Sequence, residues 1–204
     1  TSKPTALFSN TQIENPNLML EGMPNYRSGV DGLRVSNSTK GGITFAASTT
    51  QNGIHMITVV LGVEAVDGDP YARFVATSSL MNYVVRTFVS SIVVKEGDPY
   101  GKSKATVMDG KSETVLAVAK KDFYIVEKQG SQAEPKIQFK SDQESFRAPV
   151  KSGTNLGKLH YTDPDKIGRG YLEDQEPTVD MVAGRTIEKS FFLKVWWNEF
   201  VRYV

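Results

Sequence analysis

Between residues 91 and 184 the sequence consists of short apolar segments separated by turn residues, and this pattern restricts the fold more than any other feature. The candidate strands are residues 92–95, 114–119, 123–128, 136–139, 158–161 and 178–183. Glycine, proline and aspartate break the pattern between them, as at 96–99 and 109–110. Many short strands joined by such turns are typical of a β-sandwich or barrel. We therefore predict an all-β, sandwich-like domain over residues 91–185.

A different pattern precedes this region. Residues 43–48 and 56–61 are apolar runs rich in Ile, Val and Thr, and Asn52-Gly53 lies between them, which predicts a β-hairpin. Asp69 and Pro70 then suit the start of a helix. Its apolar stripe is Phe74, Val75, Ser78, Met81, Val85 and Phe88. We predict that this stripe packs on the hairpin, and that the polar, proline-containing residues 1–26 form loop.

The composition argues against several classes of function. The chain of 204 residues has 24 basic and 23 acidic side chains, so it lacks the basic excess of a nucleic-acid-binding protein. It has no cysteine, which excludes disulfides, zinc-thiolate sites and cysteine nucleophiles. His55 and His160 have no second ligand at suitable spacing, and we predict that both are ordinary strand residues. The acidic stretch at 163–176 lacks the spacing of a calcium loop, so we expect no metal and no other cofactor.

The C-terminal segment, residues 186–204, has a helical period. On a helix with 100° per residue, its large apolar side chains fall within an arc of about 140°. Those expected at a membrane interface are Phe192, Leu193, Trp196, Trp197, Phe200 and Tyr203. Each would cost roughly 1.5–3 kcal/mol to leave in water, and tryptophan favours the membrane interface. We expect a peripheral helix on a membrane surface; the alternative is a helix packed on its own domain or on a second copy.

Several segments resemble one known family: residues 29–33, 43–48, 55–61, 70–74, 77–81 and 191–198. They resemble the C-terminal part of low-molecular-mass D-alanyl-D-alanine carboxypeptidases, the penicillin-binding proteins of peptidoglycan metabolism, and residues 191–198 are similar to streptococcal members. The resemblance runs over nearly the whole chain. It covers only the end of that family's catalytic domain and the β-rich domain after it. It implies an α+β remnant of a penicillin-binding, transpeptidase-like domain over residues 1–90, the β-rich domain over 91–185 and an amphipathic, membrane-anchoring helix over 186–204.

The resemblance also identifies a substrate-binding strand. After Asp-Gly-Leu the family has Lys-Thr-Gly, which binds the substrate carboxylate, and the matching residues here are Arg34, Val35 and Ser36. Arg34 keeps a positive charge with a different donor geometry, Val35 has no hydroxyl, and Ser36 has a side chain where close approach needs glycine. The backbone N–H of Asn37 takes the place of half of the family's oxyanion hole. We interpret residues 34–37 as a degenerate form of this strand.

The family's catalytic residues are missing from the sequence. Its nucleophile is a serine followed three residues later by a lysine, and no serine here has a lysine at that position. The second motif, Ser-x-Asn, does not occur either. Lys151-Ser152-Gly153 matches the carboxylate-binding tripeptide by letters, but it lies in the β-rich region, where it predicts a turn. We therefore predict that the chain contains no catalytic residue.

Three functions follow from these observations. In the first, the chain is a non-catalytic portion of a D-alanyl-D-alanine carboxypeptidase-like protein, a β-rich module outside the cell and peripheral on the cell-wall side of the cytoplasmic membrane. Its partners would be the membrane surface and, as a candidate ligand, peptidoglycan. In the second, it belongs to an active serine carboxypeptidase whose Ser-x-x-Lys lies on a missing segment or a second chain. In the third, it is a β-sandwich that binds carbohydrate or protein, unrelated to penicillin binding.

The N-terminal region is expected to be incomplete by itself. The hairpin at 43–61 and the helix at 74–88 would normally pack against parts of the domain that this sequence does not contain. The first residue is Thr1 and not Met, which favours an upstream segment that was removed, or a tag remnant. We expect an upstream segment or a partner chain to complete the domain, because exposed strand edges and apolar faces favour pairing.

Overall fold

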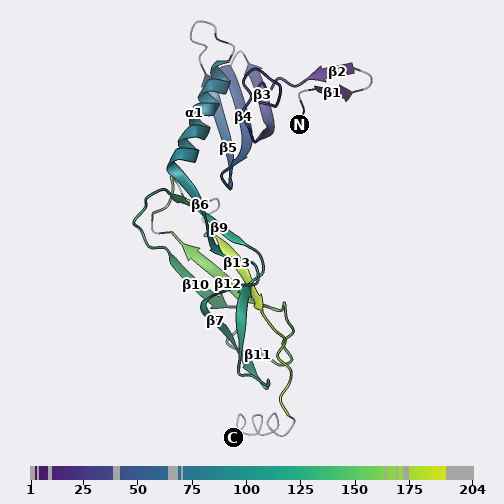
Figure 1. The fold of residues 1–204 in the computed structure, drawn as a ribbon, viewed down its shortest axis with the longest axis vertical. Coiled ribbons are helices and arrows are strands. Elements are labelled where there is room, and N and C mark those ends of the chain that lie inside the picture. Colours follow the sequence, from purple (N-terminus) through teal and green to yellow (C-terminus); the bar gives the residue numbers. More distant parts are fainter. Residues whose placement is uncertain are drawn as a thin grey trace. The chain divides into compact units, whose positions relative to one another are not determined.

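The computed structural model describes residues 3, 5–8, 11–38, 42–63, 69, 71–163, 165–168, 170–171 and 175–191. These residues form a mostly β structure with one helix, α1 (Figure 1). The chain divides into two compact units. The first contains Thr1–Ser90 and Val126–Gln129, and the second contains Ser91–Ile125 and Gly130–Val204.

The first unit is built on a three-stranded antiparallel sheet with the order β3-β4-β5. Its strands are β3 (Val30–Ser38), β4 (Gly42–Gln51) and β5 (Ile54–Val63). Asn52 and Gly53 connect β4 to β5 with φ angles of 51° and 74°, the two positive values that a type I′ turn requires. The predicted Asn-Gly hairpin is therefore confirmed.

Helix α1 (Ala72–Thr87) packs on one face of this sheet, and the contact forms the core of the first unit (Figure 1). The ring of Phe45 meets the ring of Phe74 edge to face, with centroids 5.1 Å apart. Two residues of the preceding loop, Met19 and Leu20, are buried in the same core. The Oδ1 of Asn17 accepts a hydrogen bond from the Met19 N–H at 3.0 Å, which fixes this buried turn.

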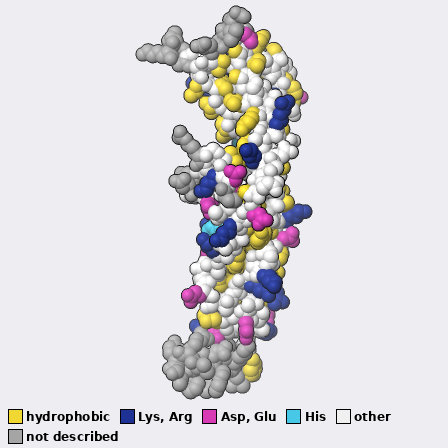
Figure 2. Space-filling view, turned by 90° about the vertical axis from the view of Figure 1, so that its left-hand side faces the viewer, with side chains coloured by type: hydrophobic (Ala, Val, Ile, Leu, Met, Phe, Trp, Pro, Cys, Tyr) yellow, Lys and Arg dark blue, Asp and Glu magenta, His cyan; other side chains and the backbone are white. Residues whose placement is uncertain are grey.

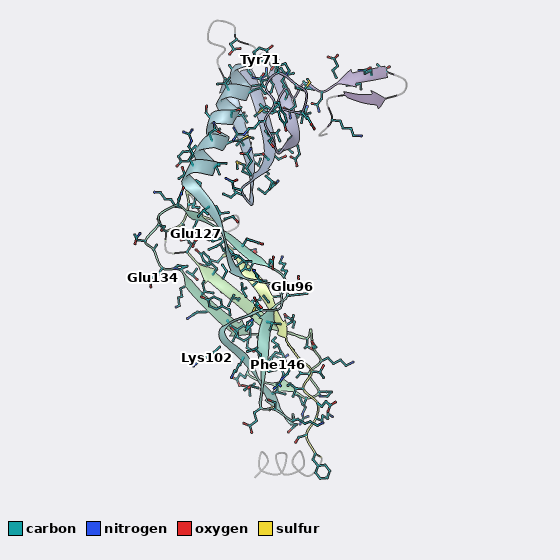
Figure 3. The ribbon with its side chains drawn as sticks, in the orientation of Figure 1. Tyr71, Glu96, Lys102, Glu127, Glu134 and Phe146 are labelled. Carbon is teal, nitrogen blue, oxygen red and sulfur yellow. The ribbon has the colours of Figure 1, made fainter. Side chains whose placement is uncertain are left out.

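The helix differs from the prediction in its start and in its buried face. Asp69 does not cap it: its Oδ1 accepts a hydrogen bond from the N–H of Tyr71, and Tyr71 is itself the residue before the first turn (Figure 3). Val75, predicted in the apolar stripe, is 55% exposed, whereas Thr77 is fully buried. Thr77 tolerates burial because its hydroxyl donates to the carbonyl of Arg73 at 2.8 Å.

The prediction that residues 1–26 form only loop is wrong. Strands β1 (Thr5–Phe8) and β2 (Thr11–Glu14) form an antiparallel hairpin. Threonine and isoleucine in β2 favour extended backbone, but a strand of four exposed residues gives no apolar alternation that a sequence pattern could reveal.

The second unit contains a six-stranded sheet with the order β10-β12-β13-β8-β7-β11. Neighbouring strands are antiparallel except for β11, which runs parallel to β7. The strands are β7 (Pro99–Met108), β8 (Thr114–Ala119), β10 (Lys136–Ser141), β11 (Phe146–Arg147), β12 (Asn155–Thr162) and β13 (Thr178–Ala183). A separate two-stranded sheet pairs β6 (Phe88–Val94) with β9 (Phe123–Lys128), and each of these strands has residues in both units.

One core lies within this second unit. Buried Leu156, Leu159, Val179 and Met181 contribute to it from β12 and β13, and Phe146 joins from β11 (Figure 3). The prediction of an all-β region is confirmed, and residues 114–119, 123–128 and 178–183 are strands with the predicted bounds. Strand β7 was missed because its inward positions include Ser103 and Ala105, which do not form an apolar run.

The prediction of a helix from residue 186 is wrong for residues 186–191, which are not helical and form isolated β-bridges at Ile187 and Lys189. Ile187 and Val150 form a β-bridge with reciprocal N–H···O=C bonds of 2.7 and 2.9 Å, and Ile187 is buried in the core. This pairing satisfies the backbone groups that a helix would have used. Residues 192–204, which include the expected membrane-interface side chains, lie outside the described residues. Among the described residues, no helical segment has the length and hydropathy of a transmembrane span.

Candidate functional site

The predicted substrate strand is β3, which lies at an edge of the sheet in the described part of the first unit (Figure 1). Its register pairs Arg34 with Ala46, Val35 with Phe45 and Ser36 with Thr44 on β4. Directly opposed residues share a face, so Val35 lies on the α1 side of the sheet with Phe45, and Arg34 and Ser36 lie on the other side. The side chains of Arg34 and Asn37 are exposed.

An open hollow adjoins this strand. Its empty space is about 540 Å³, and its lining residues are Lys3, Ile13, Glu14, Asn15, Pro16, Leu33, Arg34 and Val35. The guanidinium of Arg34 and the ammonium of Lys3 are donors suited to a carboxylate. The edge of β3 can also add an extended peptide through its backbone N–H and C=O groups. The sequence does not predict the hollow, because residues 13–16, which form one of its walls, show no apolar pattern that would place them beside β3.

Two side chains hold the carbonyl of Ser36. The hydroxyl of Thr44 donates to this oxygen at 3.2 Å, and Nη1 of Arg73 donates to it at 3.2 Å. Nη1 of Arg73 also donates to the Thr44 carbonyl at 3.3 Å, and its Nη2 donates to Oδ1 of Asn37. Burial lowers the pKa of Arg73 from its ordinary value. Sequence reasoning missed Arg73, because its acceptors lie 29 to 37 residues earlier in the chain.

Asp31 joins the start of β3 to β4, and the Arg27 side chain holds the loop that precedes the strand. The carboxylate of Asp31 accepts a hydrogen bond from the hydroxyl of Ser48 on β4. Arg27 donates to Oδ1 of Asn82 on α1 at 2.8 Å and to Oε1 of Gln51 on β4 at 2.9 Å. Burial lowers the pKa of Arg27 as well. The loop before β3 is therefore tied both to the helix and to the sheet.

The other motif residues lie apart from this strand. Lys151-Ser152-Gly153 forms an exposed turn in the second unit, as predicted, and the N–H of Ser152 donates to Oγ1 of Thr186 at 3.0 Å. His55 and His160 lie on β5 and β12, also as predicted. Burial and the nearby charges of Lys140 and Lys158 lower the pKa of His160. Among the described residues, no three His, Asp or Glu side chains are grouped to hold a metal ion.

Comparison with known proteins identifies the relatives of this chain. Residues 88–189 match the family model described as penicillin-binding protein 5, C-terminal domain. The structure is similar to the crystal structure of a peptidoglycan synthesis regulatory factor (PBP3) from Streptococcus pneumoniae, with 44% identity, a TM-score of 0.86, and coverage of 92% of this chain and 51% of that one. Penicillin-binding protein 5 from Haemophilus influenzae shares the fold, with 22% identity, a TM-score of 0.60, and coverage of 92% and 50%.

A curated relative agrees with these structures. The D-alanyl-D-alanine carboxypeptidase DacA of Haemophilus influenzae is 27% identical over 133 residues, which are 65% of this chain and 32% of that protein. The chain therefore spans about half the length of its solved relatives and about a third of this curated one. The resemblance found in the sequence is confirmed: the chain belongs to the penicillin-binding protein 5 family of D-alanyl-D-alanine carboxypeptidases, and residues 88–189 are its C-terminal domain.

Proposed function

We propose that this chain is a non-catalytic, C-terminal portion of a D-alanyl-D-alanine carboxypeptidase-like protein, and that it acts on the outer side of the cytoplasmic membrane, next to the peptidoglycan. The observation that carries the proposal is the 44% identity to the pneumococcal PBP3 structure over 92% of this chain. The sequence supports the non-catalytic part, because it contains no Ser-x-x-Lys pair. The organisation we propose is a remnant of the penicillin-binding domain at 1–90, the β-rich domain from residue 91 and an amphipathic helix within residues 192–204.

Strand β3 supports a residual role in ligand binding. Its open edge, the exposed Arg34 and the adjoining hollow together suit a peptide that ends in a carboxylate. The family's Lys-Thr-Gly motif has glycine at the position of Ser36. Because serine adds a side chain there, we expect a ligand to lie less closely against β3 than against the same strand of an active relative. We infer weak binding of a peptidoglycan peptide without hydrolysis.

The chain alone is expected to remain unlabelled by a fluorescent penicillin on a denaturing gel. Covalent labelling needs an activated hydroxyl, and a serine without a neighbouring lysine amine attacks the lactam only slowly. An active D-alanyl-D-alanine carboxypeptidase in the same tube serves as the positive control. Covalent label on this chain would contradict the proposal. If label appears only on a longer protein that carries an upstream Ser-x-x-Lys segment, the second candidate, an active carboxypeptidase, is the correct one.

The described part of the first unit has an exposed apolar surface. Strand β5 forms the other edge of the sheet, and its outward side chains Ile57, Val59 and Leu61 are exposed, Leu61 by 75%. Figure 2 shows further hydrophobic side chains at the surface of this unit. Large exposed apolar faces beside an open strand edge are typical of an interface. They support our proposal that an upstream segment of the same polypeptide, or a second chain, completes the domain.

By itself the chain is therefore expected to self-associate, and light scattering should give a mass above that of a monomer. The double variant Ile57→Lys/Val59→Lys should return it to the monomer, because two charges on this face are costly to bury. Leu116→Lys, on the partly exposed side of β8 in the second unit, is the control and should not change the mass. A wild-type monomer at high concentration would contradict this expectation.

The C-terminal residues are proposed to bind anionic membranes peripherally. The apolar arc that includes Trp196 and Trp197 should supply most of the free energy, because each basic residue adds only about 1 kcal/mol near an anionic surface. Replacing both tryptophans with alanine should abolish most sedimentation with vesicles, whereas Lys194→Ala should reduce it only slightly. If tryptophan emission does not shift to the blue with vesicles, or the two variants lose binding equally, packing on protein is the better interpretation.

A further inference from the structure

The buried guanidinium of Arg73 lies against β3, the predicted substrate strand. Arg73 is on α1, and only 6% of it is exposed. Burying an arginine is unfavourable unless its donors are satisfied. Two of its nitrogens donate to three oxygens of the β3–β4 pair: the carbonyls of Ser36 and Thr44 and the side chain of Asn37. The helix is therefore bonded to the part of β3 that carries the degenerate substrate motif.

The bond to Ser36 determines the direction of the Asn37 N–H. The carbonyl of Ser36 and the N–H of Asn37 belong to one planar trans peptide, so they point in opposite directions. The Ser36 carbonyl points towards β4, because Thr44 on β4 donates to it at 3.2 Å. The N–H of Asn37 must then point away from β4, towards the open edge of β3.

We propose that Arg73 is a positioning residue, which fixes the Ser36–Asn37 peptide so that the N–H of Asn37 faces a ligand along the edge of β3. This inference rests on the proposed function, in which β3 binds a peptidoglycan peptide. The N–H would donate to the carboxylate or the last carbonyl of that peptide. Arg73 lies beneath the sheet and acts on the ligand only through this peptide group.

Two variants separate positioning from general stability. Arg73→Met keeps much of the side-chain volume but removes the donors to Ser36 and Asn37. Arg27→Met is the control, since the Arg27 side chain also joins α1 to the sheet but donates to Ser78, Asn82 and Gln51, none of which lies in β3. Arg73→Lys restores a charged donor and should recover part of the function. If Arg73→Met does not fold, Thr44→Val, which removes the other side-chain donor to the Ser36 carbonyl, gives the same measurements.

The experiment uses the full chain labelled with ¹⁵N and an acetylated peptide ending in D-alanyl-D-alanine. Arg73→Met should shift the Asn37 amide resonance and speed its hydrogen exchange, and should weaken peptide binding about tenfold, as expected for loss of a charged hydrogen bond that orders the site. Arg27→Met should change neither measurement. An unchanged Asn37 amide in Arg73→Met, or equal losses of binding in both methionine variants, would overturn the inference.

The two proposals fail differently in this experiment. If the wild-type chain does not bind the peptide, the proposed substrate role of β3 is wrong, and the Asn37 amide alone then decides whether Arg73 positions the strand. If the wild-type chain binds and Arg73→Met binds equally well, the substrate role stands and the positioning role is wrong.

Discussion

Replacing Gly157 with alanine is expected to unfold the second unit, or to lower its free energy of unfolding by about 3 kcal/mol or more. Gly157 lies at a bulge in β12 with a φ of 148°, a conformation that L-residues rarely adopt. A Cβ there would lie 2.1 Å from the carbonyl oxygen of Lys140 and 2.8 Å from the Cα of Ser141. Both atoms belong to the backbone of β10, which pairs with β12 at this point, so neither can move without breaking the ladder. Urea unfolding followed by circular dichroism measures the loss.

Gly130 provides the matched control for this substitution. It also has a positive φ, 77°, but in the described part of the chain no atom lies within 4 Å of the position of its Cβ. Gly130→Ala should therefore show only the cost of the left-handed conformation, roughly 1–2 kcal/mol. Equal losses for the two variants would mean that backbone conformation alone, and not the contact with β10, determines the requirement for glycine at 157.

Local sequence patterns are sufficient to predict those strands and turns that their own residues determine. The Asn52-Gly53 turn follows from the tolerance of both residues for positive φ, and β13 follows from a compact apolar run bounded by turn residues. Strand β7 shows the limit. Its inward Ser103 and Ala105 are buried, but small side chains like these give no apolar signal in the sequence.

Contacts between residues far apart in the chain account for the other errors. The helical period from residue 186 predicts a helix because it does not include long-range pairing. The bridge between Ile187 and Val150 satisfies the backbone N–H and C=O groups of Ile187 without a helix. Apolar residues alone predict the buried face of α1, and this criterion selects Val75, which is exposed, and omits Thr77, which is buried. A hydrogen bond within the helix makes Thr77 compatible with the core, and a scale of hydrophobicity does not record it.

The residues of the candidate site also fall into those that the sequence predicts and those that only contacts between distant residues reveal. Residues 34–37 could be located from the sequence, because the motif is contiguous and one strand presents it. The hollow beside Arg34 could not be located, since its other wall comes from the end of β2 and the two residues after it, Ile13 to Pro16. Arg73 was also missed, because an arginine in a helical stripe is usually solvated, and only the paired strands β3 and β4 bring its acceptors together.

Phe45→Ala is expected to lower the stability of the first unit by about 3–5 kcal/mol, the cost of emptying a buried aromatic site. Phe45 is almost fully buried, and its ring meets Phe74 edge to face at 5.1 Å, so the variant loses both buried area and an aromatic pair. Tyr83→Ala is the control. Tyr83 makes a similar edge-to-face pair with Phe88, with centroids 6.1 Å apart, but it is 60% exposed, so the loss should stay within about 1 kcal/mol.

Amide signals from the two units allow this expectation to be tested together with the one for Gly157. In Phe45→Ala the signals of β4 and β5 should disappear first with denaturant, while those of β12 and β13 keep their wild-type midpoint. In Gly157→Ala the order should be reversed, because the clash lies between β10 and β12. Each core gains its stability from residues of its own unit, Phe45 and Phe74 in one and Leu159 and Met181 in the other. If both variants lowered every midpoint equally, the two units would unfold as one cooperative structure and this division of stability would be wrong.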